Sequence, residues 1–223
     1  MATATDTFTG FDREAIQFLV DLAENNDRAW FTPRKGEYER LLKEPLEVLC
    51  VALDERFQAR SIPLRADTRS PFRIYRDVRF SKDKSPYKTN VAASFPYTDG
   101  YAGAGGYFHF SPGEMYIGGG MWHPEPGRLA AWRAFVDRGV VLEPLDDPAF
   151  VETFGEIQGD SLTRVPQGYP KDHPRADLLK LKDMTFGRRL SDDDALSPNL
   201  PDILADHFAK AVPVFRMLGS LPD

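Results

Sequence analysis

The residues best suited to chemistry lie close together between positions 72 and 88. In this stretch six basic side chains surround two aspartates and a tyrosine: Arg73, Arg76, Arg79, Lys82, Lys84, Lys88, Asp77, Asp83 and Tyr87. Arginine offers a fork of donors that matches a carboxylate or a phosphate, and lysine adds a point charge. The pattern therefore predicts a site for a small anionic ligand that is bound through a phosphate or a carboxylate.

The residue types also indicate roles. The candidate ligand-binding residues are Arg73, Arg76, Arg79, Lys84, Lys88 and, after a run of three glycines at 118–120, His123. Asp77 would orient an arginine or act as a base, and Tyr87 would donate a proton or a hydrogen bond, so these two are the catalytic candidates. For His123 a capping or surface role is the alternative. The glycine run predicts a bulge or bend, or else the close approach of a second backbone or a ligand.

The positive charge of this region is local. Residues 65–88 include eight basic and three acidic side chains, a net charge of +5, whereas the whole chain carries −6 and the remainder therefore −11. A basic island in an acidic protein favours a focused anion site and argues against a general nucleic-acid surface. Two alternatives stay open: an internal ion-pair network that is purely structural, and an interaction module that docks an acidic partner or a nucleic-acid backbone.

The conformation of this stretch is predicted from its alternation. Apolar residues in 72–80 fall on one side of a strand, interrupted by Arg76, and charged residues fall on the other side. A guanidinium in an apolar row must be paired or lie at an opening, because an unpaired buried charge is very costly. Residues 81–86 are typical of a turn, so we expect a β-hairpin. A helix is the alternative, because Arg73 and Asp77 are four residues apart on one helical face.

The rest of the chain predicts helices at both ends around a sheet. Further strands are expected at about 87–97, 106–110 and 114–121, with an edge strand at 184–190. Helical spacing predicts long helices at about 12–24, at 32–60 with a break or kink at Pro45, and at 201–218. Shorter helices are expected after Pro126, Pro148 and Pro174. The fold class is therefore α+β, with a central antiparallel meander of about four strands or more packed with N- and C-terminal helices.

The length and composition of the chain limit the classes of protein to which it can belong. A chain of 223 residues, 42% of them hydrophobic, fits a single globular domain, 1–223, with about the first ten residues flexible. The one cysteine, Cys50, excludes an internal disulfide and lies in an apolar helical row that predicts a core position. No apolar run reaches the roughly 18 residues of a membrane span, and the N-terminus lacks a signal-peptide pattern. We therefore expect a cytoplasmic protein that does not bind a membrane.

The chain lacks the sequence motifs of several common enzyme and cofactor-binding classes. No Walker A sequence, no G-x-S-x-G elbow and no H-E-x-x-H metal motif occurs in the chain. The four histidines are scattered, which argues against a metal site, and the glycines at 103–106 lack the third glycine of a dinucleotide fingerprint. We expect no metal and no cofactor, and the sequence leaves open whether the protein is an enzyme.

The stretch from Arg73 to Tyr87 matches the pattern R-x-x-R-D-x-R-F-x-x-x-K-x-x-Y. This pattern resembles the signature of a bacterial family known as domain of unknown function 2461. The segments at 25–31 (N-N-D-R-A-W-F) and 168–174 (G-Y-P-K-D-H-P) are similar to that family as well. Its members are about as long as this chain, so the resemblance implies kinship over nearly all of it. The family has no assigned activity, so the resemblance implies no mechanism.

Overall fold

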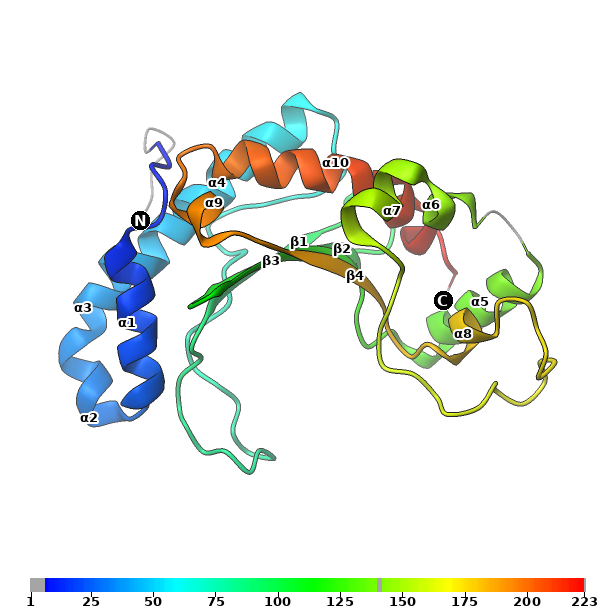
Figure 1. Ribbon diagram of the computed structural model, residues 1–223, viewed down its shortest axis with the longest axis horizontal. Coiled ribbons are helices and arrows are strands. Elements are labelled where there is room, and N and C mark those ends of the chain that lie inside the picture. The colour runs from blue at the N-terminus through cyan, green and yellow to red at the C-terminus, as the bar shows by residue number, and fades with distance from the viewer. Residues whose placement is uncertain (1–6, 140–141, 223) are drawn as a thin grey trace.

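The computed structural model describes residues 7–139 and 142–222, which form a four-stranded antiparallel sheet with helices around it (Figure 1). The strands are β1 (Val91–Pro96), β2 (Ala104–Ser111), β3 (Glu114–Met121) and β4 (Met184–Leu190), and they pair in that order. The first three follow one another directly, and β4 joins the edge of the sheet beside β3. The predicted α+β fold with an antiparallel meander is confirmed.

Helices precede, interrupt and follow the sheet. The N-terminal elements are α1 (Arg13–Glu24), α2 (Arg28–Phe31), η1 (Thr32–Arg34), α3 (Lys35–Tyr38), η2 (Glu39–Lys43) and α4 (Glu44–Ala59). Between β3 and β4 lie α5 (Pro126–Asp137), α6 (Glu143–Asp146), α7 (Pro148–Phe154) and α8 (Ala176–Lys180). The chain continues after β4 through α9 (Asp192–Leu196) and α10 (Leu200–Gly219). Of these, α4 and α10 lie together on one face of the sheet (Figure 1).

Local chemistry explains how the N-terminal helices begin and bend. Asp12 caps α1, because its carboxylate accepts a hydrogen bond from the backbone N–H of Glu14 at 2.9 Å. The irregularity expected at Pro45 takes the form of a π-helical turn, η2, which passes directly into α4. Proline has no N–H, and its ring crowds the carbonyl four residues earlier. A wider turn before Pro45 accommodates both effects without ending the helix.

Two aromatic rings of α10 cover one face of the sheet. Phe208 and Phe215 are fully buried, and they lie over two glycines, Gly106 and Gly119, that pair across β2 and β3. A Cβ atom at Gly106 would lie 2.7 Å from the Phe208 ring, and one at Gly119 would lie 2.7 Å from the Phe215 ring. The helix therefore reaches the sheet only because these two positions carry no side chain.

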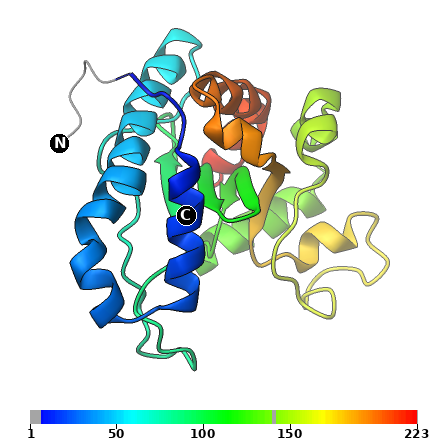
Figure 2. The same ribbon diagram turned by 60° about the vertical axis from the view of Figure 1, so that its left-hand side comes forward.

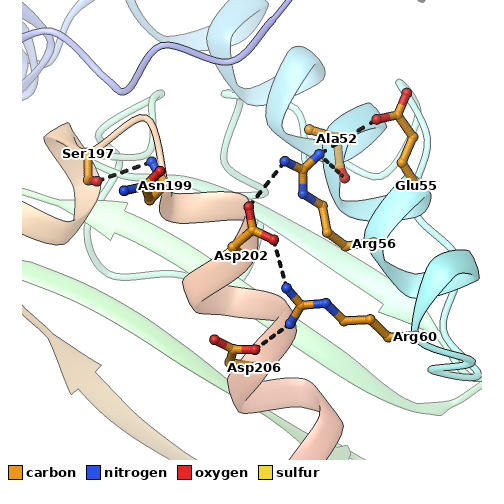
Figure 3. Close-up of polar contacts among 8 residues, drawn as sticks. All are labelled: Ala52, Glu55, Arg56, Arg60, Ser197, Asn199, Asp202 and Asp206. Atoms are coloured by element: carbon orange, nitrogen blue, oxygen red, sulfur yellow. Dashed lines mark hydrogen bonds and ion pairs between the residues drawn. The ribbon is translucent and has the colours of Figure 1, made fainter.

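Ion pairs join α4 to α10 beside this packing (Figure 3). Asp202 accepts from Arg56 at 3.2 Å and from Arg60 at 2.7 Å, and Arg60 also pairs with Asp206. The two arginine side chains are about one-third exposed. Pairs of this kind contribute up to about 1 kcal/mol each, so they align the two helices while the aromatic rings supply most of the stabilisation.

The predicted regular strand at 72–80 is wrong. The chain does reverse direction between 72 and 90, but only isolated bridges form, at Pro71–Ala93 and Tyr75–Tyr87. Cationic side chains take the place of ladder partners: Lys84 donates to the carbonyl of Val78 at 2.9 Å, and Lys88 to that of Arg73 at 2.9 Å. Carbonyl groups satisfied in this way need no neighbouring strand. The segment is called loop 72–90 below.

Three further features bear on the expectations from the sequence. Residues 1–6, part of the segment expected to be flexible, lie outside the described residues, whereas Phe8 is buried and packs edge-on against Phe11. Cys50 is fully buried, as predicted, and burial raises the pKa of its thiol. In the described ranges, none of the helices has the length and apolarity that crossing a membrane would require.

The packing of α10 on the glycine pair is testable by adding one methyl group. We expect Gly119→Ala to destabilise the protein by about 1–3 kcal/mol, because its Cβ would overlap the Phe215 ring and the carbonyl oxygen of Gly105. Gly36→Ala is the matched control, because a Cβ there meets no atom within 4 Å and alanine favours a helix. Urea unfolding followed by circular dichroism measures both. Equal stability of the two variants would contradict the packing described.

Candidate functional site

The other face of the sheet, called the open face below, forms the floor of a cavity of about 870 Å³. Its strand residues alternate with those under α10 and include Ser94, Tyr107 and Tyr116. One wall is loop 72–90, which in Figure 1 descends on the side of the sheet away from α10. Trp122, directly after β3, and Thr185 in β4 form another part of the lining. The volume lies within the usual range for small-molecule sites, about 300–1,000 Å³.

The centre of this floor is bare backbone. Gly105 and Gly120 pair across β2 and β3 on the open face, and both line the cavity. Gly120 has a positive φ of 115°, and a Cβ there would lie 2.1 Å from the carbonyl oxygen of Met184. Only glycine fits at this position, and the missing side chains let a ligand rest directly on the sheet.

Aromatic side chains stand beside the bare floor. The His109 ring stacks on Tyr116 with centroids 5.3 Å apart, and Tyr107 lies 6.3 Å from Tyr116. Burial raises the pKa of the Tyr107 and Tyr116 hydroxyls and lowers the pKa of His109, so all three are neutral hydrogen-bonding groups at pH 7. Sequence reasoning missed Tyr107 and Tyr116, which line the cavity, and His109 beside them. The available signal was the alternation of these residues with buried neighbours, such as Phe108 and Phe110 in β2.

Two of the three candidate arginines are paired within loop 72–90. Arg76 pairs with Asp83 and donates to the carbonyl of Ser85 at 3.1 Å. Arg79 donates to both carboxylate oxygens of Asp77, at 3.0 and 2.7 Å. The hydrogen bond from Arg79 lowers the pKa of Asp77 to about 2. Bonds from Ser85, followed by the one from Arg76, lower the pKa of Asp83 to about 2. Asp77, which lines the cavity, is therefore a weak base that is paired with Arg79.

The remaining cations of the loop differ in what holds them. The ammonium of Lys88 lies 5.2 Å from the Phe72 ring centroid and donates to the carbonyl of Arg73. Burial, followed by repulsion from Arg73, lowers the pKa of Lys88. Within the described part of the chain, no carboxylate pairs with either Lys88 or Arg73. Lys84 is bound to the loop backbone and does not line the cavity.

Tyr87 holds the loop against the N-terminal helices. Its side chain is only 3% exposed, and its ring stacks on Phe31 at 4.1 Å. Its backbone N–H and carbonyl both bond to the side-chain amide of Asn26 at 3.0 Å. Both views show the loop running beside these helices (Figure 1 and Figure 2). Tyr87 does not line the cavity, so the structure separates it from Arg76 and Lys88, with which the sequence groups it.

His123 forms a tight pair with a residue that the sequence did not single out. Oδ1 of the buried Asp183 accepts from the His123 backbone N–H at 2.6 Å and lies 2.7 Å from its ring Nδ1. Burial by itself would raise the pKa of Asp183, but these hydrogen bonds outweigh it and hold the pKa below its ordinary value. His123 does not line the cavity, whereas its neighbour Trp122 does.

The side chains that line the cavity define its means of recognition. Across residues 7–139 and 142–222, no group of three or more His, Cys, Asp or Glu side chains is placed to hold a metal ion. The lining offers hydrogen-bond donors, aromatic rings and basic groups, together with the carboxylate of Asp77.

The fold and the cavity together define an α+β protein with a basic loop beside the open face of an antiparallel sheet. The chain belongs to the family described as conserved hypothetical protein (DUF2461), whose model matches residues 14–217. The resemblance read from the sequence is thereby confirmed at the level of the family. Comparison with curated proteins and with solved structures gives no significant match.

The two arginine pairs should differ in their importance for stability. We expect Arg76→Ala to lower the melting temperature by about 2–4 °C, because it removes a bond to the loop carbonyl of Ser85 as well as the pair with Asp83. Arg79→Ala should leave the melting temperature nearly unchanged, because the Arg79–Asp77 pair lies in solvent. Differential scanning calorimetry measures both variants. A larger decrease in melting temperature for Arg79→Ala than for Arg76→Ala would contradict this ranking.

Proposed function

We propose that the protein binds a small anionic ligand, through a phosphate or a carboxylate, in the cavity on the open face. The observation that carries this proposal is the state of Lys88. Lys88 lines the cavity, and its ammonium is partly desolvated and has a backbone carbonyl and an aromatic ring as its neighbours.

A cation in such surroundings is stabilised by an anion from outside. Transfer of a charge out of water is costly unless an opposite charge compensates it. Arg73 lies outside the lining and makes no ion pair within the described ranges, although it lies close enough to Asp77 to help lower the pKa of that carboxyl, and it adds a second positive charge close to Lys88. Arg76 also lines the cavity, and the bonds it makes with described residues use Nη1. Its remaining N–H groups can serve a ligand.

The proposal is narrower than the one read from the sequence. It relies on Lys88 and Arg76, which line the cavity, and on the nearby charge of Arg73, which does not line it, whereas Arg79 and Lys84 are occupied within the loop and lie outside the lining. The pair with Asp77 favours the structural alternative for Arg79, whereas Arg76 braces the loop through Nη1 and keeps its other N–H groups for a ligand. The neutral hydroxyls of Tyr107 and Tyr116 supply hydrogen-bond donors on the floor.

Removal of one positive charge tests the proposal. We expect Lys88→Met to weaken the binding of phosphate and carboxylate compounds by about 10- to 100-fold, the usual value of a hydrogen bond to a charged group. Lys82→Met is the matched control, because Lys82 is exposed on the same loop and does not line the cavity. Isothermal titration calorimetry against a panel of such compounds measures the effect. Equal affinities for both variants, or no binding by the unaltered protein, would overturn the proposal.

The lowered pKa of Lys88 sets a pH dependence. In the free protein, burial and the charge of Arg73 disfavour the ammonium form, so Lys88 loses its proton at a lower pH than an ordinary lysine, whose pKa is 10.5. An anion binds the charged form, so affinity is complete at neutral pH and falls as pH rises toward the lowered pKa. Sulfate is the suitable probe, because its charge is constant over this range. Lys88→Arg should keep its affinity to higher pH, and an identical decline in both proteins would exclude Lys88 as the titrating group.

A further inference from the structure

We propose that the ligand also carries a planar aromatic ring, and that this ring stacks on Trp122 while the anionic group lies at Lys88. A nucleoside monophosphate and an aromatic carboxylate share this chemistry. The inference rests on the proposed anion site and names the class of molecule that fits it.

The sheet topology separates the two anchors. Lys88 lies just before β1 begins, and Trp122 directly follows the end of β3. Both strands are antiparallel to β2, so they run in the same direction, and the start of β1 lies at the opposite end of the sheet from the end of β3. Both residues line one cavity. A ligand that reaches both must extend along the open face, with its charge at one end and its ring at the other.

The Trp122 side chain is exposed to solvent, but a neighbouring ring holds it in one orientation. It is 72% exposed, although a large aromatic side chain is ordinarily buried. Its indole stacks on the His123 ring with centroids 4.0 Å apart and planes 17° from parallel. Within the described ranges no other ring packs on Trp122. An indole that is held on one side and lines a cavity is a platform on which a planar ligand can stack.

The His123–Asp183 pair explains how the platform is held. His123 has a positive φ of 49°, which is uncommon for a residue other than glycine and carries strain. Two contacts to one oxygen of the buried Asp183 fix both its backbone and its ring. His123 and Asp183 therefore act as positioning residues that keep the indole in place. This role also accounts for the position of His123 outside the lining.

The surface between the two anchors suits a flat molecule. Gly105 and Gly120 expose bare backbone, so a ring can lie on the sheet without meeting a side chain. The Phe72 ring, 45% exposed and 6.4 Å from Tyr107, continues the aromatic lining toward Lys88. Exposed aromatic side chains at two places in one cavity indicate that the apolar part of the ligand completes their burial.

The test compares matched phosphates and carboxylates by isothermal titration calorimetry. The probes are inorganic phosphate, ribose 5-phosphate and adenosine monophosphate, with 4-phenylbenzoate and 4-cyclohexylbenzoate as the carboxylate arm, because only an extended molecule can reach both anchors. We expect adenosine monophosphate to bind about 5- to 100-fold tighter than ribose 5-phosphate, which has the same phosphate and no base, and 4-phenylbenzoate to bind tighter than 4-cyclohexylbenzoate, whose outer ring has no π face. Preference for adenosine monophosphate or for 4-phenylbenzoate then identifies the source of the ring.

Variants assign the preference to Trp122. Trp122→Ala should remove the advantage of the aromatic probes and leave the affinity for inorganic phosphate unchanged, whereas Trp122→Phe should retain most of the advantage. Phe80→Ala is the matched control, because Phe80 is 95% exposed and lies outside the lining. Since Trp122 is exposed, these variants should fold, and Trp122→Leu gives a second test if Trp122→Ala does not.

The outcomes separate this inference from the proposed function. Equal binding of adenosine monophosphate and ribose 5-phosphate, together with equal binding of the two benzoates, would overturn the aromatic ligand and leave the anion site standing. An aromatic preference that survives Trp122→Ala would also overturn the inference. If none of the probes binds, whether or not it carries a ring, both the aromatic inference and the proposed anion site are overturned.

Discussion

The architecture depends on the contact between α10 and the sheet. Phe208 and Phe215 reach the strands because Gly106 and Gly119 leave room for their rings, so α10, together with α4, covers one face of the sheet. The opposite face has no such cover, and its glycines and tyrosines remain free to form the floor of a cavity. The glycines of β2 and β3 thus serve both faces: two admit the helix, and their neighbours expose backbone to a ligand.

Charged side chains are paired differently at the tip and at the base of loop 72–90. At its tip, Arg76 and Arg79 are matched by Asp83 and Asp77, and these pairs fix the shape of a segment that lacks strand pairing. At its base, Lys88 has no carboxylate partner among the described residues and is partly desolvated. The proposed anion site and the structural pairs therefore share Arg76, whereas Lys88 belongs to the proposed site alone.

The sequence predicted regular elements well where their periodicity was strong. The α+β class, β3 and the C-terminal helix follow from alternation and helical spacing. The strand at 72–80 was wrong, because alternation does not reveal that lysine side chains bind the carbonyls that a strand would use. Tyr87 was grouped with the basic residues by proximity in the sequence, although it turns away to stack on Phe31. Asp183 was missed, because it meets His123 only through a contact across sixty positions.

The most direct test of the account is a selenate soak of crystals of the protein, with the ion located by its anomalous signal. The account predicts a selenate on the open face of the sheet, about 3 Å from the ammonium of Lys88 and near Arg73 and Arg76. Selenate found on the exposed side chains at the tip of the loop, with none beside Lys88, would contradict it.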